Sequence, residues 1–102
     1  MYTIDMNVEK TETYEKWFKA LKDEIGKAHI ARRIRRIETE DFFGDCEPLG
    51  EKLFELRIHY GPGYRVYFEK RSNNIIVLLL LAGTKKTQKK DIEKAKKMMK
   101  EI

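Results

Sequence analysis

The middle of the chain carries residue types that can bind a phosphodiester and assist its cleavage. Arg57 and His59 alternate with apolar residues in one segment, and Arg65 and Tyr67 alternate with apolar residues in the next. Guanidinium groups bind phosphate oxygens through paired hydrogen bonds. Strand positions also hold such groups more rigidly than loops do. We therefore expect a phosphate-binding patch if these two segments lie side by side.

Residues 61–63, Gly-Pro-Gly, are the turn signal that joins the two segments into a β-hairpin. A loop of this length predicts that Tyr60 pairs with Tyr64. The apolar faces of both strands stay continuous only in a register of this parity, because a slip of one residue turns one apolar set outward. The predicted cross-strand pairs on the polar face, about 5 Å apart, are His59 with Arg65 and Arg57 with Tyr67.

A second group of cations follows the next apolar run, residues 75–82. After a Gly-Thr pair come Lys85 and Lys86. If the run is an antiparallel neighbour of the hairpin, its end returns near Arg65. We therefore expect both lysines at the edge of the patch, where two arginines, a histidine, a tyrosine and the lysines together suit a phosphodiester.

Three cationic features of the sequence each have two interpretations. The polar strand face also fits ordinary solvation, with Glu55 and Glu69 pairing with the arginines. The arginine-rich run 32–36 fits the exposed face of a helix as well as a nucleic-acid contact. The lysine-rich stretch 85–100 fits an ordinary charged helix as readily as a nucleic-acid arm.

Hydrophobic periodicity predicts the elements that would position the patch. Apolar residues at helical spacing predict a helix that Thr11 caps and Gly26 ends, followed by a second helix over 28–38 in an antiparallel hairpin. The fold class is therefore α+β. The predicted order is a short N-terminal strand at 2–6, the helical hairpin, an antiparallel β-sheet of strands 54–60, 64–68 and 75–82, and a C-terminal helix at 89–102.

Length and composition limit the classes to which the chain can belong. Its 102 residues and 41% hydrophobic content fit one domain over 1–102. The net charge of +5 favours an acidic partner over simple solubility. Because there is one cysteine, Cys46, and two histidines, we expect neither a disulfide nor a metal site, and no cofactor. The N-terminus shows no signal pattern and the run 75–82 is too short to span a bilayer, so we expect a cytoplasmic protein without membrane contact.

Four blocks of sequence carry a resemblance to a known family. They are Phe-Gly-Asp-Cys-Glu-Pro-Leu-Gly at 43–50, Glu-Leu-Arg-Ile at 55–58, Tyr-Gly-Pro-Gly-Tyr-Arg-Val-Tyr-Phe at 60–68, and Leu-Leu-Leu-Ala-Gly-Thr-Lys-Lys-Thr-Gln at 79–88 followed by Lys-Asp-Ile at 90–92. In this order and spacing they resemble the HigB-like addiction module killer protein branch of the RelE/ParE toxins. The two preceding helices also fit, so the resemblance covers essentially the whole chain.

The resemblance implies a toxin that a co-expressed antitoxin, expected to be of the helix-turn-helix type, neutralises in a hetero-oligomer. RelE-type members cleave messenger RNA on the translating ribosome with basic residues instead of a metal. Arg65 matches the arginine of the family's Gly-Tyr-Arg block, Arg57 a basic position on the preceding strand, and Lys85 the lysine after the last strand. These three are the expected catalytic residues, and the expected RNA contacts are Lys86, His59 and Tyr67. The chain departs from the family pattern at Glu47, where we expect a basic residue, and at Thr84, where we expect an acidic one.

RNA is cut without a metal when its own 2′-hydroxyl attacks the adjacent phosphate. The reaction needs an in-line geometry, proton transfer and stabilisation of the charge on phosphorus. We expect the two arginines to stabilise that charge. We expect Lys85 or Lys86 to hold the phosphate or protonate the leaving oxygen, and His59 or Glu55 to accept the proton.

Two other functions remain open from the sequence. ParE-type relatives share the fold but inhibit DNA gyrase as protein ligands, and they need no phosphate-cleaving residues. The pair Arg57 and Arg65 favours the nuclease over this alternative. A plain RNA-binding domain ranks last, because the chain lacks the exposed aromatic ladders on which bases stack.

Overall fold

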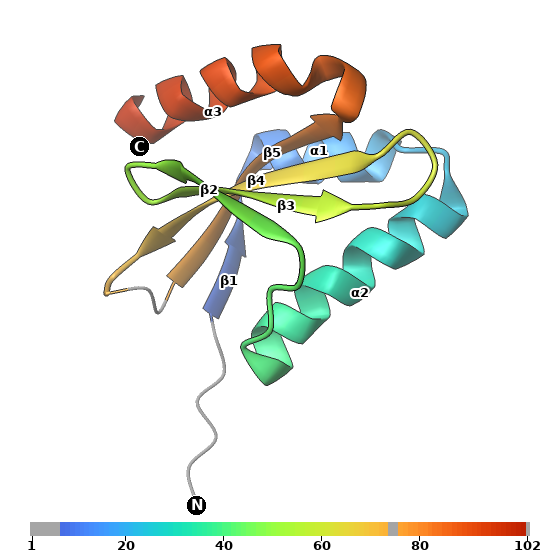
Figure 1. Cartoon of the computed structure of the whole chain (residues 1–102), viewed down its shortest axis with the longest axis horizontal. Coiled ribbons are helices and arrows are strands. Elements are labelled where there is room, and N and C mark those ends of the chain that lie inside the picture. The colour runs from blue at the N-terminus through green and yellow to red at the C-terminus, as the bar shows by residue number, and fades with distance from the viewer. Residues whose placement is uncertain (1–6, 74–75, 102) are drawn as a thin grey trace, which may run out of the picture.

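The computed structural model describes residues 7–73 and 76–101, which form the expected mixed α+β fold (Figure 1). Its elements are β1 (Asn7–Lys10), α1 (Glu12–Ala20), α2 (Glu24–Glu40), β2 (Cys46–Gly50), β3 (Leu53–Ile58), β4 (Tyr64–Arg71), β5 (Ile76–Thr84), the 3₁₀ turn η1 (Lys85–Thr87) and α3 (Gln88–Glu101). The strand predicted at 2–6 lies outside the described residues, and β1 takes the place of the short N-terminal strand. None of the helices within the described ranges combines the length and the apolar composition that a membrane span requires.

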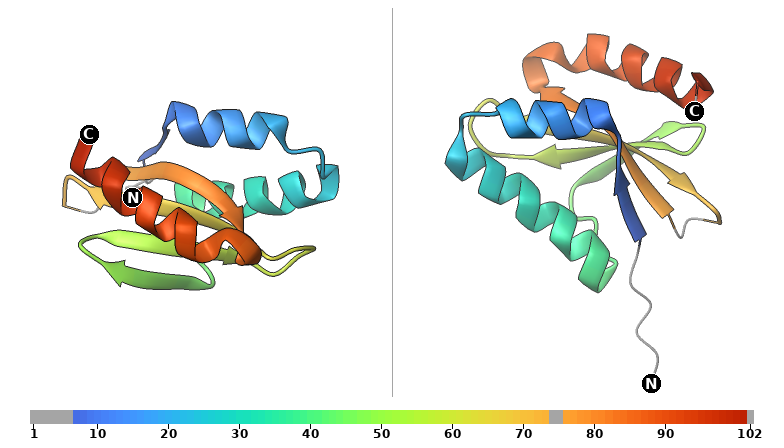
Figure 2. Two further views of the ribbon diagram at one scale, coloured as in Figure 1. Left: turned by 90° about the horizontal axis from the view of Figure 1, so that it is seen from above. Right: turned by 180° about the vertical axis from the view of Figure 1, so that it is seen from behind.

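The strands form one five-stranded sheet in the order β1-β5-β4-β3-β2. β1 runs parallel to β5, and the other neighbouring strands are antiparallel. α1 and α2 cover one face of the sheet and α3 crosses the other, so the sheet is the middle of three layers (Figure 2). Because both faces are covered, the central part of β5 is buried throughout, as its unbroken apolar run predicted.

The helical hairpin is present, but its turn lies earlier than predicted. Thr11 caps α1 as expected, and its side chain accepts a hydrogen bond from the backbone N–H of Tyr14 at 3.1 Å. Gly26 does not end this helix; it lies in the first turn of α2 and donates its N–H to Asp23 Oδ1 at 2.9 Å. A Cβ at Gly26 would lie 2.7 Å from the Tyr64 ring. The glycine therefore permits close packing of helix on sheet.

β2 is an edge strand that no alternating pattern predicts. It contains Pro48 and Gly50, and its pairing with β3 is irregular between these two residues. Proline is tolerated on an edge strand because one side of the strand has no hydrogen-bonded neighbour. β2 matters here because it brings residues 45–47 beside the end of β3.

The β3–β4 hairpin keeps the predicted faces but not the predicted register. Ile58, not Tyr60, is the partner of Tyr64, so the loop comprises residues 59–63. This loop closes through a hydrogen bond from the Gly63 N–H to the Tyr60 carbonyl at 3.0 Å, and Gly63 adopts a φ of 78°. A shift of two residues preserves the parity of the pleat, which is why the apolar set still faces the helices.

Alternation along β3 and β4 divides an apolar face from a polar one. Leu56, Val66 and Phe68 are fully buried in the core formed with α1 and α2. The alternate positions lie on the face that α3 crosses. They are Glu55, Arg57, Arg65 and Tyr67.

Candidate functional site

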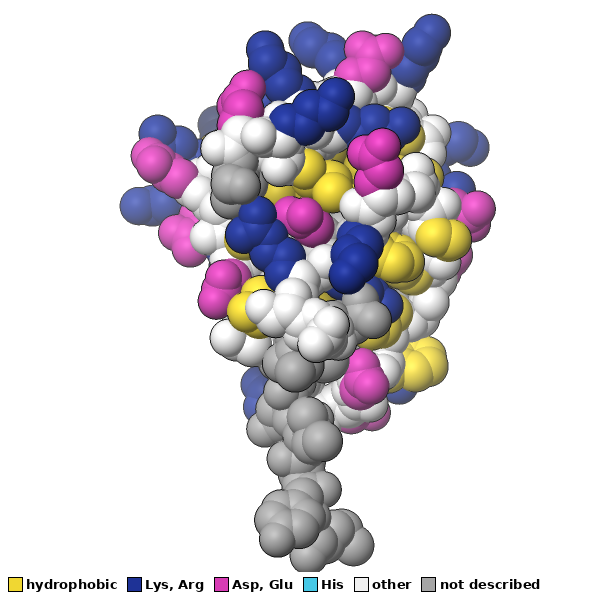
Figure 3. Space-filling view, turned by 90° about the vertical axis from the view of Figure 1, so that its left-hand side faces the viewer, with side chains coloured by type: hydrophobic (Ala, Val, Ile, Leu, Met, Phe, Trp, Pro, Cys, Tyr) yellow, Lys and Arg dark blue, Asp and Glu magenta, His cyan; other side chains and the backbone are white. Residues whose placement is uncertain are grey.

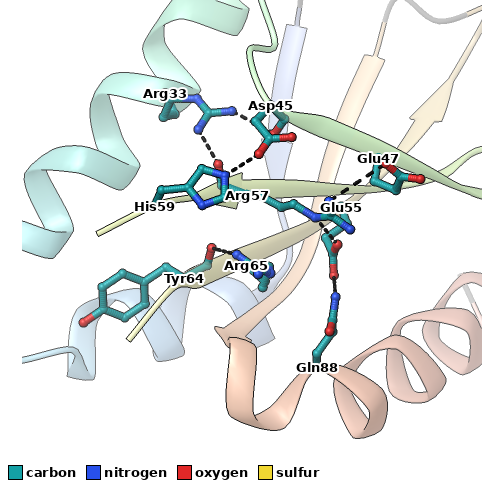
Figure 4. Close-up of polar contacts among 9 residues, drawn as sticks. All are labelled: Arg33, Asp45, Glu47, Glu55, Arg57, His59, Tyr64, Arg65 and Gln88. Atoms are coloured by element: carbon teal, nitrogen blue, oxygen red, sulfur yellow. Dashed lines mark hydrogen bonds and ion pairs between the residues drawn. The ribbon is translucent and has the colours of Figure 1, made fainter. Parts of the chain in front are cut away.

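Arg57 and Arg65 lie directly opposite each other on the α3 side of the sheet. They are cross-strand partners of β3 and β4, which corrects the predicted pairs of His59 with Arg65 and Arg57 with Tyr67. The cause is the longer loop, which moves the pairing by two residues. Both side chains occupy the same face (Figure 4). The side chain of Arg57 is 32% exposed, whereas Arg65 is 6% exposed. We call these two residues, with Lys85, the arginine patch.

Glu55 is a fully buried carboxylate that holds Arg57 in place. Its Oε1 accepts a hydrogen bond from Arg57 Nε at 2.8 Å, and its Oε2 accepts one from Gln88 Nε2 at 2.7 Å. Although burial by itself raises the pKa of Glu55, the hydrogen bonds from Gln88 and Arg57 bring that pKa below its ordinary value. Glu55 is therefore ionised, and it links the first residue of α3 to the patch.

Arg65 lacks such a partner. Its Nη1 lies 3.5 Å from the Tyr64 carbonyl oxygen, and its buried Nε has no hydrogen-bond acceptor among the described residues. No carboxylate of residues 7–73 and 76–101 lies within ion-pair distance of it. A buried cation without a counter-charge is unfavourable, so an anion bound here would supply the missing partner.

Tyr67, expected to contact RNA, lies beneath the patch rather than on its surface. The residue is fully buried and belongs to the cluster in which Ala95 of α3 packs on the sheet. Burial and the charge of Glu55, its cross-strand partner, raise the pKa of the Tyr67 hydroxyl. The hydroxyl stays protonated at neutral pH and has no hydrogen-bond partner within the described part of the chain.

Lys85 and Lys86 lie at the edge of the patch, as the strand order predicted. Arg65 is paired with Gly83 near the end of β5. The backbone N–H of Lys85 then donates to the Gly63 carbonyl at 2.7 Å. A Cβ on Gly63 would lie 3.4 Å from the Lys85 Cβ and 3.8 Å from Arg65 Nη1. Both lysines have exposed side chains.

His59 lies in the loop after β3, outside the opposed pair of arginines. Its exposed ring contacts Asp45 through Nε2 and Oδ2 (Figure 4). The hydrogen bond from His59 lowers the pKa of Asp45. The backbone N–H of Arg57 also donates to the Asp45 carbonyl at 3.0 Å, so this pair is attached to the end of the patch. Among the residues described, no three His, Cys, Asp or Glu side chains cluster closely enough to hold a metal ion.

Arg33 of α2 is a positioning residue that the sequence did not single out. Its guanidinium group donates to the carbonyl oxygens of Phe43 at 2.7 Å and Asp45 at 3.0 Å, and also to that of Arg57. It therefore fastens the segment before β2 to the backbone of β3. A signal was present, because Arg33 follows Ile30 by three residues and so shares the inward face of the helix.

Comparison with known proteins places the chain in a family. It matches the family of phage-derived, Gp49-like proteins (DUF891) over residues 16–100. It is also 41% identical over 99 residues to an uncharacterised protein of Haemophilus influenzae, and the match covers 97% of this chain and 98% of that protein.

The fold recurs in solved toxin structures. The free E. coli toxin RelE, solved as a double arginine mutant, superposes with a TM-score of 0.63 at 11% identity, covering 78% of this chain and 83% of that one. A chain of the RelBE2 toxin–antitoxin complex from Mycobacterium tuberculosis superposes with a TM-score of 0.60 at 19% identity, covering 80% and 100%. These structures show that the chain has the RelE fold. The match over residues 16–100 and the identity of 41% to the Haemophilus influenzae protein establish that the chain belongs to the Gp49-like family of phage-derived proteins.

Proposed function

We propose that the protein is the toxin of a type II toxin–antitoxin module, of the HigB-like branch of RelE/ParE toxins, and that it cleaves messenger RNA on the ribosome. The observation that carries the proposal is the meeting of Arg57 and Arg65 on one sheet face, with Lys85 at its edge. The RelE fold, shared with proteins described as a toxin and a toxin–antitoxin complex, supports it. The proposal includes a cytoplasmic location and a cognate antitoxin, expected to be of the helix-turn-helix type.

The proposed reaction is attack of the RNA 2′-hydroxyl on the adjacent phosphate, which leaves a cyclic phosphate and a free 5′-hydroxyl. Phosphorus gains negative charge in the transition state. Arg65 is suited to stabilise this charge, because no protein carboxylate within the described residues competes for it. One well-placed donor of this kind lowers the activation free energy by roughly 3–4 kcal/mol.

The remaining residues either orient an arginine of the patch or transfer a proton. Glu55 orients Arg57 and is a poor proton acceptor, because both of its oxygens accept hydrogen bonds and its pKa is lowered. His59, held by Asp45 at the end of the patch, is the proposed acceptor. Exposed Lys85 is the proposed donor to the leaving oxygen. Because these groups are few, the ribosome is proposed to hold the RNA in an attack-ready bend.

The test is substitution of Arg65 by alanine. Arg65→Ala is expected to abolish growth inhibition and the cutting of cellular messenger RNA, with cut sites mapped after a short induction. Arg71→Ala is the matched control, because Arg71 lies on the same strand and pairs with Glu69 away from the patch. Thermal unfolding of both purified variants checks that each is folded. Relief of growth arrest by the co-expressed product of the adjacent gene tests the antitoxin.

Three results would each overturn a part of the proposal. A folded Arg65→Ala variant that still cuts messenger RNA would remove Arg65 from the mechanism. Efficient cutting of naked RNA would remove the ribosome from it. Inhibition of purified gyrase in a supercoiling assay, with messenger RNA left intact in cells, would replace the nuclease by the ParE-type activity.

A further inference from the structure

The unit formed by η1 and α3 concentrates the positive charge of the chain. Residues 85–101 contain eight lysines and three acidic residues, so this unit alone has the net charge of +5 that the whole chain has. All eight lysine side chains are exposed. Within residues 7–73 and 76–101, none of them lies within ion-pair distance of a carboxylate. The charge is therefore free to attract an external anion.

The outer side of α3 presents these lysines because its inner side packs against the sheet. The inner side is formed by Ile92, Ala95, Met98 and Met99. On the outer side, Lys90, Lys94 and Lys97 follow one line along the helix, with the Cβ atoms of neighbouring lysines about 5–6 Å apart. Figure 3 shows dark-blue side chains gathered at the top of the molecule, where α3 lies, with some acidic side chains among them.

The beginning of this line joins the arginine patch. An open hollow of about 340 Å³ lies there, lined by Lys86, Thr87, Lys89, Lys90 and Glu93. Lys85 precedes the hollow and is hydrogen-bonded through its N–H to Gly63, beside Arg65. Cationic groups therefore continue from the patch on the sheet to the far end of α3.

We propose that the lysine strip of Lys86, Lys90, Lys94 and Lys97 is a docking surface for the phosphate backbone of structured RNA. The strip holds the RNA, and the arginine patch acts on the phosphate to be cut; this division of roles rests on the proposed function. Lysine ammonium groups are point charges on flexible stems, so they follow a backbone without reading its bases.

The chemistry of the strip favours a polyanion over a protein or a membrane. Protein-binding hot spots are built around aromatic residues and arginine, and the outer side of α3 carries neither. A helix that lies on a membrane inserts an apolar side into it. The apolar side of α3 is already packed on the sheet.

The test compares two triple variants with the same loss of charge. One is Lys90→Gln, Lys94→Gln and Lys97→Gln, and the control on β1 and α1 is Lys10→Gln, Lys16→Gln and Lys19→Gln. Binding of a fluorescent 2′-O-methyl RNA hairpin is measured over about 50–200 mM salt. The strip variant is expected to bind roughly tenfold more weakly and to lose about 2–3 units of the slope of log K against log salt. The control is expected to bind within about twofold of the unchanged protein.

The hairpin lacks the attacking hydroxyl, so binding is measured apart from cleavage. A protein that cuts no messenger RNA but binds the hairpin through the strip would refute the nuclease and keep the docking surface. Equal weakening in both variants would show a dependence on net charge alone and would overturn the strip. Strip-dependent binding of phosphatidylserine vesicles or polyglutamate, with hairpin binding unchanged, would overturn RNA as its partner.

Discussion

At the scale of single residues, Glu55 has the most consequences for the site. It is fully buried, yet its charge is stabilised because Arg57 and Gln88 donate to its two oxygens. The pKa of Glu55 is therefore lower in the folded protein than its ordinary value of 4.5. A group of this kind stabilises the fold above its unfolded pKa, and that stabilisation is lost as the pH falls through the folded pKa.

Glu55→Gln is expected to lower the free energy of unfolding at pH 7 by roughly 1–3 kcal/mol, because the charged acceptor of Arg57 is removed. Between pH 7 and a pH below 4.5, the variant is expected to lose less stability than the unchanged protein. Urea unfolding at several pH values measures both effects. Glu47→Gln is the control, since Glu47 is an exposed carboxylate 4.0 Å from the same arginine. Identical pH profiles for the Glu55 variant and the unchanged protein would contradict the ionised state of Glu55.

At the scale of elements, α2 supports the site from behind the sheet. Arg33 reaches three backbone carbonyls, and one of them belongs to Arg57. Burial lowers the pKa of Arg33, but the planar guanidinium stays charged and spans the three acceptors. The position of Arg57 therefore depends on a helix that contributes nothing to the exposed patch.

Arg33→Lys is expected to lower the free energy of unfolding by roughly 1–3 kcal/mol. A single ammonium group replaces the several N–H donors of the guanidinium, so some of the three carbonyl oxygens that Arg33 contacts lose their hydrogen bond. Arg32→Lys, at an exposed position on the same helix, is expected to change stability by less than about 0.5 kcal/mol. Chemical denaturation of the two variants compares them directly. If both were equally stable, Arg33 would not fasten the segment before β2.

At the scale of the whole molecule, one sheet serves two hydrophobic cores. The larger core lies between the sheet and the helices α1 and α2, and the smaller one lies beneath α3. The arginine patch is on the second face, so its geometry depends on the packing of both layers. Because the strands are shared, the two cores are expected to unfold together.

Removing buried volume from either core tests this dependence. Ile37→Ala on α2 and Leu80→Ala on β5 are both at fully buried positions and are each expected to cost about 2–5 kcal/mol. Thermal unfolding, followed by far-ultraviolet circular dichroism and by calorimetry, is expected to remain a single transition in each variant. A second transition in Leu80→Ala alone would show that α3 unfolds independently of the sheet.

The sequence by itself determined the order of the main elements and the faces of the central strands. Alternation along 54–58 and 64–68 separates apolar from polar residues, and a shift of two residues does not change this parity. The position of Lys85 and Lys86 near Arg65 was predicted because the run 75–82 was expected to lie antiparallel to the neighbouring strand of the hairpin. Thr11 could be recognised because capping depends on residues adjacent in sequence.

Only the tertiary structure decided which residues meet. The closure of the loop at 59–63 set Arg57, not His59, opposite Arg65, and this depends on backbone geometry that a Gly-Pro-Gly signal does not specify. The burial of Glu55 and the three contacts of Arg33 depend on elements far apart in the chain. Local patterns fix the faces of elements, but contacts between distant elements arise from packing in three dimensions.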